Sequence, residues 1–327
     1  MPTNDHTSLS ELIITLQTSL SILHKQDIQT AATILGQYVH TPTNTPIHLG
    51  DDCAAIPDGE GYLLLAAEGL WPQLVTQDPW FAGWCAIMVN ISDIAAMGGT
   101  PIAVVDALWS KSVAASTPLW QGMQAAAQAY NVPIVGGHTN CHSPYDGLAV
   151  AILGRAQRLI TSFDAQPGDD LVMVVNMAGS YYGDYPFWNA ATTAEPAVLQ
   201  QQLGLLPKLA EGGLCHAGKD ISMGGLAGTL LMLTEASGCG ATLNLDWVPR
   251  PADVAWDKWL TSFPSFGFLL TVPSEKLAQV QALFRPYGLT CEAIGQVTAG
   301  SQVIFQQGGE QELFWDLSCP LTGFGKG

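Results

Sequence analysis

Four short stretches of the chain carry the acidic and amide side chains best suited to bind a metal ion. They are Gly50-Asp51-Asp52, Glu68-Gly69, Asn90-Ile91-Ser92-Asp93 and Lys219-Asp220-Ile221-Ser222. Carboxylates gathered in a cleft repel one another and lose hydration, and a bound cation offsets both effects. Hard oxygen ligands suit Mg²⁺, which proteins commonly share with substrate phosphates. The pattern therefore predicts a magnesium–nucleotide site.

Residue type alone leaves some of these assignments open. Asp51 and Asp52 would point to opposite sides of a strand, whereas both could face a cleft from a turn after Gly50. An ordinary capped surface turn explains the same two residues. Asp93 lies in an otherwise apolar helical pattern, where an uncompensated carboxylate is costly, so a ligand role is favoured. Asn90 lies on the same helical side and could bind ribose or phosphate, or make a hydrogen bond in the core.

The elements that must position these residues follow from apolar periodicity and from Gly and Pro breaks. Residues 8–40 have a helical pattern, with a second helix expected over 28–38, and Pro79 to Met97 form a long helix. Shorter helices are expected at residues 118–130, 197–204, 225–237 and 273–284. Strands are expected at residues 62–67, 102–108, 133–138, 148–153, 171–175, 241–245, 266–272 and 302–305. Residues 162–170 resemble a linker, which suggests two domains.

Composition narrows the class of partner. The 327 residues are enough for two domains of ordinary size. The net charge is −17 and only 11 residues are Lys or Arg, without a basic run, so nucleic-acid binding is not expected. With so few cations, a bound anionic nucleotide would have to be neutralised by divalent metal and backbone N–H groups.

The cysteines and the apolar segments bear on location. Seven cysteines at wide spacings, without a C-x-x-C motif, are typical of reduced thiols rather than a disulfide or zinc framework. The first residues lack the basic and apolar regions of a signal peptide, and no stretch of 18 apolar residues occurs. We therefore expect a cytoplasmic protein that is not embedded in a membrane.

Five motifs, in this order, resemble the AIR synthase-like (PurM-like) superfamily. The runs 48–56 (HLGDDCAAI) and 89–101 (VNISDIAAMGGTP) resemble its G-D-D-A-A-V and N-x-S-D-[IL]-x-A-M-G-x-x-P signatures. Residues 135–139 (VGGHT) resemble its G-G-[DH]-[ST] turn, 165–171 (AQPGDDL) the start of its second domain, and 219–226 (KDISMGGL) its D-[IV]-[ST]-x-G-G-L turn. The first two signatures are specific, and an AIR synthase-related branch is the nearest in pattern. Thiamine-monophosphate kinase and selenophosphate synthetase are similar members.

The resemblance implies an α+β, two-domain PurM-like fold. It comprises an N-terminal mixed sheet that pairs across a homodimer, and a C-terminal α/β domain. The expected divisions are an N-terminal helical segment at 1–40, an ATP-binding domain at 41–160 and a C-terminal domain at 161–327. Most members use ATP and Mg²⁺ to phosphorylate or activate an oxygen, sulfur or selenium atom of a small molecule.

The matching positions supply candidate roles by resemblance. The metal ligands would be Asp51, Asp52, Glu68, Asp93 and Asp220, of which Asp93 and Asp220 would be catalytic. The cofactor-binding residues would be Asn90, Gly136, Gly137, His138 and Thr139. The two glycines would let a backbone turn approach a phosphate.

Four departures from the family pattern modify this expectation. Glu68 stands where Asp is usual, Met223 stands where the kinase branch has a second Asp, and His138 replaces an Asp, although the selenophosphate branch also has His there. His suits softer metals than Mg²⁺, so phosphate contact or a structural role is favoured for His138. The reactive N-terminal Cys and Lys of the selenophosphate branch are not matched, which argues against selenium or sulfur activation.

Two functional hypotheses follow. The first is an ATP- and Mg²⁺-dependent kinase, ligase or cyclo-ligase acting on a small-molecule substrate. The alternative is a non-catalytic nucleotide-binding subunit of a larger complex, and a structural dimer without a ligand is a weaker third reading. An aromatic loop at residues 181–188 could line a substrate pocket or simply pack on itself.

Overall fold

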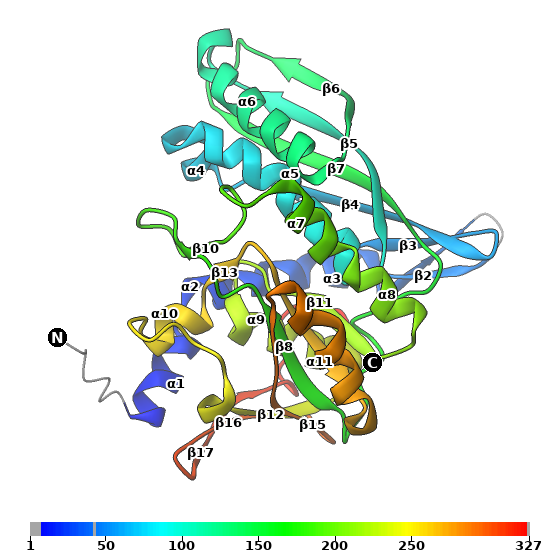
Figure 1. The fold of residues 1–327 in the computed structure, drawn as a ribbon, viewed down its shortest axis with the longest axis vertical. Coiled ribbons are helices and arrows are strands. Elements are labelled where there is room, and N and C mark those ends of the chain that lie inside the picture. The colour runs from blue at the N-terminus through cyan, green and yellow to red at the C-terminus, as the bar shows by residue number, and fades with distance from the viewer. Residues whose placement is uncertain (1–7, 42–43, 326–327) are drawn as a thin grey trace. The chain divides into compact units, whose positions relative to one another are not determined.

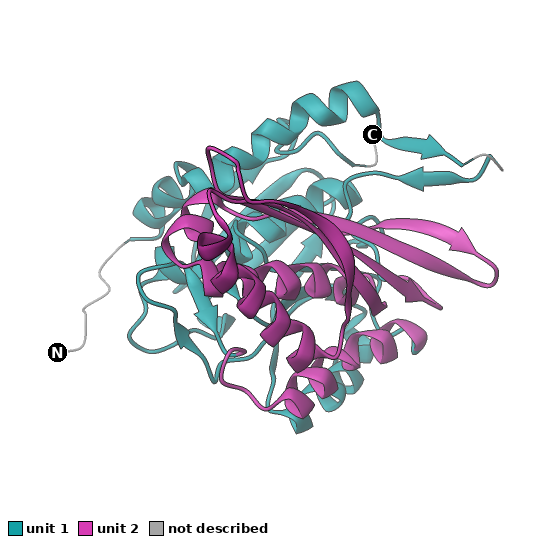
Figure 2. Cartoon of the chain, turned by 90° about the horizontal axis from the view of Figure 1, so that it is seen from above, with its two compact units in different colours: residues 1–51, 160–190, 212–327 teal, residues 52–159, 191–211 magenta. Residues whose placement is uncertain are grey.

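The computed structural model describes residues 8–41 and 44–325 (Figure 1). The chain divides into two compact units, and each is built from segments that are not consecutive (Figure 2). Unit 1 comprises residues 1–51, 160–190 and 212–327, and unit 2 comprises residues 52–159 and 191–211. The sequence predicts domain boundaries at residues 40 and 160. The compact units combine non-consecutive segments, so they do not test those boundaries.

Unit 2 is built on a five-stranded sheet in the order β3-β4-β7-β5-β6. All neighbours are antiparallel except β5 and β6, which are parallel. The strands are β3 (Ala54–Asp58), β4 (Gly61–Gly69), β5 (Thr100–Trp109), β6 (Ile134–Asn140) and β7 (Gly147–Ala156).

The two faces of this sheet differ in exposure, as the period-2 alternation of its strands requires. Leu64, Val104 and Ile152 point to one face and are at most 2% exposed. Leu65 and Leu153, which are cross-strand partners, point to the other face and are 48% and 38% exposed. One face is therefore covered by the helices of unit 2, and the other is an apolar surface.

Two long helices form the cover. Helix α5 (Pro79–Ala96) packs on β4, β5 and β7, and α6 (Val113–Tyr130) packs on α5. The axes come close because Gly83 and Gly122 lie at the crossing, where any Cβ would collide with backbone of the facing helix. Helix α6 begins five residues before the expected start, because the Ser112 hydroxyl caps it through Ala115 N (3.1 Å). The shorter helices are α4 (Pro72–Gln77), α7 (Pro196–Leu203) and α8 (Leu205–Glu211).

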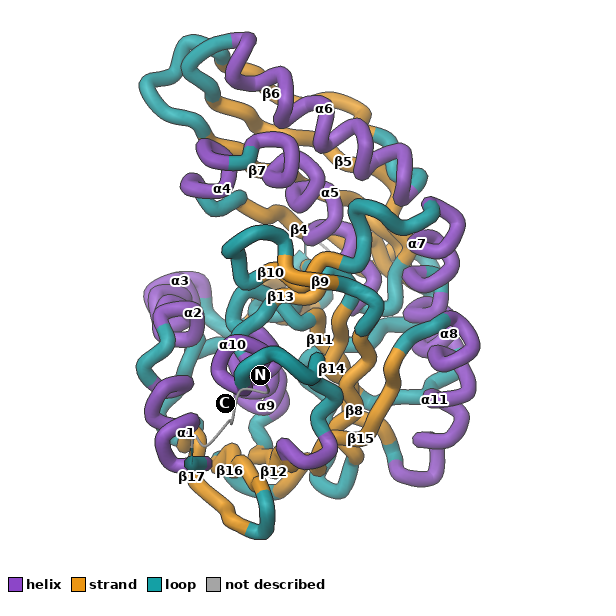
Figure 3. Tube along the Cα trace, turned by 60° about the vertical axis from the view of Figure 1, so that its left-hand side comes forward, coloured by secondary structure: helices purple, strands orange, loops and turns teal. Residues whose placement is uncertain are grey.

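Unit 1 is built on a seven-stranded sheet in the order β11-β14-β8-β15-β12-β16-β17 (Figure 3). Only β12 and β16 are parallel neighbours. The strands are β8 (Asp170–Val175), β11 (Ala217–Asp220), β12 (Gly240–Asn244), β14 (Gly267–Val272), β15 (Thr290–Thr298), β16 (Gln302–Gln307) and β17 (Glu310–Asp316).

Helices cover both faces of the unit 1 sheet. Helix α1 (Leu9–Gln17), which begins with a Ser8–Glu11 capping box, and α9 (Gly225–Ser237) share one apolar core with β8, β12 and β16. Helix α11 (Leu277–Phe284) packs on β15 and buries Phe284 completely. Because both faces of the sheet are covered, the side chains of β8 are buried on both sides, which explains its near-continuous apolar sequence.

Smaller elements complete unit 1. They are α2 (Leu20–Leu23), α3 (Ile28–Leu35), β1 (Tyr38–His40), β2 (Pro46–His48), β9 (Ser180–Tyr181), β10 (Phe187–Asn189), α10 (Trp256–Leu260) and β13 (Phe263–Pro264). The helix expected to reach residue 38 ends at Leu35, because Gly36 takes φ +78° and Tyr38 then pairs with His48 of β2. Among the described residues, no helix is long and apolar enough to cross a membrane.

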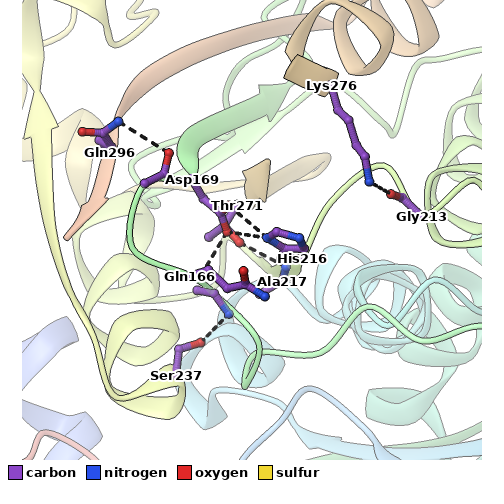
Figure 4. A network of polar contacts seen from close by, with 11 residues as sticks. Gln166, Asp169, Gly213, His216, Ala217, Ser237, Thr271, Lys276 and Gln296 are labelled. Atoms are coloured by element: carbon purple, nitrogen blue, oxygen red, sulfur yellow. Dashed lines mark hydrogen bonds and ion pairs between the residues drawn. The ribbon is translucent and has the colours of Figure 1, made fainter. Parts of the chain in front are cut away.

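The stretch expected to be a linker is ordered by a polar network (Figure 4). Asp169 accepts a hydrogen bond from Gln166 N (3.0 Å), and its other oxygen lies 2.9 Å from His216 Nδ1. Ala165 N donates to the Ser237 hydroxyl of α9. This network attaches the segment before β8 both to the start of β11 and to the end of α9.

Candidate functional site

Two of the predicted metal ligands come together within unit 2. Asp93 lies near the C-terminal end of α5 and is 7% exposed, and Asp52 precedes β3 and is half-buried. One carboxylate oxygen of each lies within 4.8 Å of the other. Two negative charges this close, one of them withdrawn from water, raise each other's energy, and a divalent cation between them would relieve it. Their oxygen donors therefore fit Mg²⁺.

Asp51 has a different environment from that of Asp52. Its two carboxylate oxygens accept hydrogen bonds from Ser162 N (3.0 Å) and Ser162 Oγ (2.6 Å), both within unit 1. The Ser162 carbonyl in turn accepts from the Ser237 hydroxyl of α9 (2.7 Å). These bonds hold the turn that begins at Gly50, so the geometry gives Asp51 a supporting role. Its assignment as a metal ligand stays a prediction.

Glu68 lies in a row of residues on the helix-facing side of the unit 2 sheet. Cross-strand pairing places Glu68 beside Val150, Val150 beside Asp106, and Asp106 beside Gly137. Directly opposite residues share a face, so Glu68 and Asp106 point to the same side, two strands apart. Glu68 is exposed, whereas Asp106 is 5% exposed.

Asp106 is an acidic residue that motif matching missed. Both its oxygens are enclosed, and within the described part of the chain neither has a side-chain or backbone hydrogen-bond partner. Burial raises the pKa of this carboxyl group above its ordinary value. The side chain lies against the backbone of β6, where a Cβ at Gly137 would collide with it. Its apolar–Asp–apolar strand context is the one sequence signal that could have drawn attention to it.

Asn90 lies inside the helical layer. It is fully buried, and its Nδ2 donates to the Ala86 carbonyl one turn earlier (2.8 Å). Its Oδ1 is enclosed and makes no hydrogen bond to the described residues. This environment agrees with the core hydrogen-bonding interpretation, and a role in nucleotide binding stays a prediction.

The expected Gly136-Gly137 turn is wrong. Strand β6 continues through both glycines to Asn140, because the parallel pairing with β5 extends to Trp109–Asn140. Within this strand, Gly137 and Thr139 share the face of Asp106, while His138 pairs with Ala107 on the opposite, apolar face. These residues lie in an edge strand, since β6 is the last strand in the order, and the cofactor-binding role of Gly136, Gly137, His138 and Thr139 stays a prediction.

Asp220 belongs to unit 1 and ends β11. It is 5% exposed, and its carbonyl accepts a hydrogen bond from the Thr229 hydroxyl of α9 (3.2 Å). The following turn needs Gly225 at φ +62°, where a Cβ would collide with the Leu260 carbonyl. The D-I-S-x-G-G motif thus encodes a strand end, a tight turn and a helix start, and Met223 in that turn is 37% exposed.

The aromatic loop of unit 1 packs on itself. Tyr182, Tyr185 and Phe187 stack in series, with neighbouring ring centroids 6.4 Å and 5.7 Å apart. Tyr181 hydrogen-bonds to Ser262 (2.7 Å), and Lys258 Nζ lies 3.8 Å from the Tyr181 ring centroid. These contacts agree with the loop-packing interpretation rather than a pocket lining.

Comparison with known proteins identifies the class. A model described as AIR synthase related protein, N-terminal domain, matches residues 50–156, and the corresponding C-terminal domain matches residues 168–307. An uncharacterized protein of Synechocystis sp. is 58% identical over 318 residues, which is 97% of this chain and 98% of that protein. Thiamine-monophosphate kinase of Synechococcus elongatus is 30% identical over 279 residues, which is 76% of this chain and 83% of that enzyme.

Solved structures agree on the fold. Thermotoga maritima PurL complexed with ATP superposes with a TM-score of 0.72 at 16% identity, covering 94% of this chain and 52% of that chain. The chain thus spans about half the length of that protein. A ThiL structure complexed with AMPPCP and TMP has a TM-score of 0.64 at 21% identity, covering 86% of this chain and 92% of that one. The two domain matches and the fold define a PurM-like protein of mixed α+β structure. More particularly, the chain belongs to the AIR synthase-related family.

Proposed function

We propose that this protein binds ATP with Mg²⁺ and transfers the γ-phosphoryl group to, or otherwise activates, a small-molecule substrate. The observation that carries the proposal is the Asp52–Asp93 pair, whose oxygens approach within 4.8 Å although Asp93 is buried. A divalent cation bound between the two carboxylates would neutralise their repulsion. Similarity to a thiamine-monophosphate kinase and to PurL, whose structure was solved with ATP, also supports nucleotide binding.

The chain's own residues would divide the work. Asp52 and Asp93, with Asp220 as a third ligand by family resemblance, would hold Mg²⁺, which supplies charge neutralisation for the phosphates. Asp51 would keep the ligand-bearing turn in place through Ser162. Phosphoryl transfer needs little covalent work from the protein, so positioning and electrostatics account for these roles.

The test is an Asp93→Asn variant compared with Glu60→Gln, an exposed acid in the β3–β4 turn of the same unit. We expect Asp93→Asn to weaken binding of a non-hydrolysable MgATP analogue by at least about tenfold in titration calorimetry, since it removes a charged ligand. ATP turnover should fall as well, and Glu60→Gln should change neither. Unchanged affinity and turnover in Asp93→Asn would refute the proposal.

A second candidate is a nucleotide-binding subunit that does not catalyse the reaction itself. Two observations favour it: Met223 fills the position of the kinase branch's second Asp, and His138 lies on the opposite sheet face from Glu68. Tight MgATP binding without turnover on any phosphate acceptor supplied would support this candidate. A melting temperature that does not rise when ATP or ADP is added with Mg²⁺ would argue against both the enzyme and the nucleotide-binding subunit.

We also propose a homodimer formed through the open face of the unit 2 sheet. This face carries Leu65, Val105 and Leu153, which are 48%, 42% and 38% exposed, with alanines between them. A contiguous apolar sheet face of this kind is rarely left to solvent. Pairing of two such faces is the arrangement that the family resemblance implies.

A further inference from the structure

The last described residues of the chain, Pro320 to Gly325, are fixed in unit 1 by side chains on two sides. On one side, the Glu235 carboxylate of α9 accepts hydrogen bonds from Thr322 N, Thr322 Oγ1 and Gly323 N at 2.8–3.1 Å. An ionised acceptor with several donors makes strong hydrogen bonds. This segment, Pro320 to Gly325, is called here the C-terminal tail, and these hydrogen bonds anchor it to α9.

Two glutamine side chains of the N-terminal segment hold the other side of the tail. Gln29 Nε2 donates to the Pro320 and Leu321 carbonyls at 2.8 Å and 3.1 Å. Gln37 Nε2 donates to the Gly323 carbonyl (2.8 Å), and Gln37 Oε1 accepts from Gly325 N (2.9 Å). The tail therefore lies between α9 and the segment that leads into β1.

These bonds place Phe324 on the turn that begins at Gly50. Phe324 is 9% exposed, and a Cβ at Gly50 would collide with its Cβ. Gly50 has φ +98°, a conformation that favours glycine, so the turn both needs glycine and is covered by the phenylalanine. Gly50 directly precedes Asp51, which Ser162 holds from the other direction.

We propose that Phe324 is a positioning residue for the Gly50-Asp51-Asp52 turn, and that Glu235 acts through the tail to keep Phe324 there. The importance of this positioning for catalysis rests on the proposed function, because the turn contains Asp52, a proposed metal ligand. Helix α9 supports the turn twice, through Glu235 and the tail and through Ser237 and Ser162. The tail lies beyond residue 307, where the match to the family domain ends.

The test compares Phe324→Ala with Phe284→Ala, a matched removal of a buried phenylalanine from α11 of the same unit. Hydrogen exchange of the ligand-free proteins is followed in peptides that cover residues 49–54. Phe324→Ala should speed exchange there by about tenfold, because a local opening loses its packing support. Phe284→Ala should leave that region unchanged while lowering overall stability. Equal exchange in the two variants would overturn the proposal.

A second pair of substitutions, which removes no buried side chain, tests the proposal if the Phe324→Ala protein does not fold. Glu235→Gln keeps the side-chain shape and loses the charge, and Glu292→Gln in β15 is its control, because Glu292 is paired with Arg285 at the surface. Faster exchange at residues 49–54 is expected only in Glu235→Gln. Weaker binding of the MgATP analogue should accompany it. If the wild type does not bind nucleotide, the proposed function fails, whereas the exchange result still decides the role of Phe324.

Discussion

The Asp106 carboxyl group has the least compensated environment among the described acidic side chains of the unit 2 sheet. Both oxygens are enclosed without a hydrogen-bond partner in the described structure, and burial raises its pKa. With a folded-state pKa above the unfolded value of about 3.9, its contribution is favourable at low pH. It is lost as the pH rises through the folded-state pKa. The residue therefore destabilises the protein at neutral pH.

We expect Asp106→Asn to raise the stability at pH 7 by about 1 kcal/mol, since the neutral amide avoids burying a charge. The gain should become smaller as the pH falls toward 4 and through the unfolded-state pKa of about 3.9, because the carboxyl group is then increasingly protonated in both the folded and the unfolded states. Urea denaturation at neutral and acidic pH measures this, with Glu60→Gln in the β3–β4 turn, an exposed acid, as control. A variant that is less stable than wild type at pH 7 would contradict the prediction.

At the scale of elements, the crossing of α5 and α6 depends on two residues without side chains. A Cβ at Gly122 would collide with the Trp80 carbonyl oxygen, so Gly122→Ala must push the helices apart. We expect a loss of about 1–3 kcal/mol or more, which outweighs the roughly 1 kcal/mol that alanine gains in helix propensity. Thermal denaturation gives the comparison.

Gly228 in α9 is the matched control for that substitution. An added Cβ there meets only Ile22 Cγ1 at 3.8 Å, an ordinary contact. Gly228→Ala should therefore stabilise the protein by up to about 1 kcal/mol through helix propensity alone. If both variants shift the melting temperature in the same direction, close packing at the crossing is not what makes Gly122 necessary.

The elements also show how far sequence reasoning reaches. The apolar period of residues 79–97 predicted helix α5, and the order of the motifs indicated the family and its mixed α+β fold. Asp52 and Asp93 do lie close together, and their role as metal ligands stays a prediction. The turn at Gly136-Gly137 was wrong, because glycine pairs do not indicate whether a neighbouring strand continues the pairing. Ser162 and Phe324 were missed, because their contacts with Asp51 and Gly50 join residues more than 100 positions apart. Local patterns contain no signal for such contacts.

At the scale of the whole molecule, the open sheet face of unit 2 gives the homodimer proposal its test. We expect Leu65→Lys to convert a dimer into a monomer, because a buried lysine at the centre of an apolar interface has no partner. Sedimentation velocity measures the change. Leu313→Lys is the control, since Leu313 is similarly exposed, at 45%, on β17 of unit 1. A wild-type protein that sediments as a stable monomer would reject the dimer itself.

Hydrogen bonds from the N-terminal segment to residues 314–325 affect the order in which the protein can fold during synthesis. Gln37 bonds to Gly323 of the tail, 286 positions away, and Gln17 bonds to Phe314 of β17, 297 positions away. Chains emerge N-terminus first at about 5–20 residues per second, and contacts of long sequence separation form slowly. All residues of unit 2 have been made by position 211, whereas the contacts that close unit 1 need residues 314–325. Helix α1 therefore waits for β17 to be synthesised, and a chain terminated before β17 would expose the apolar side of α1.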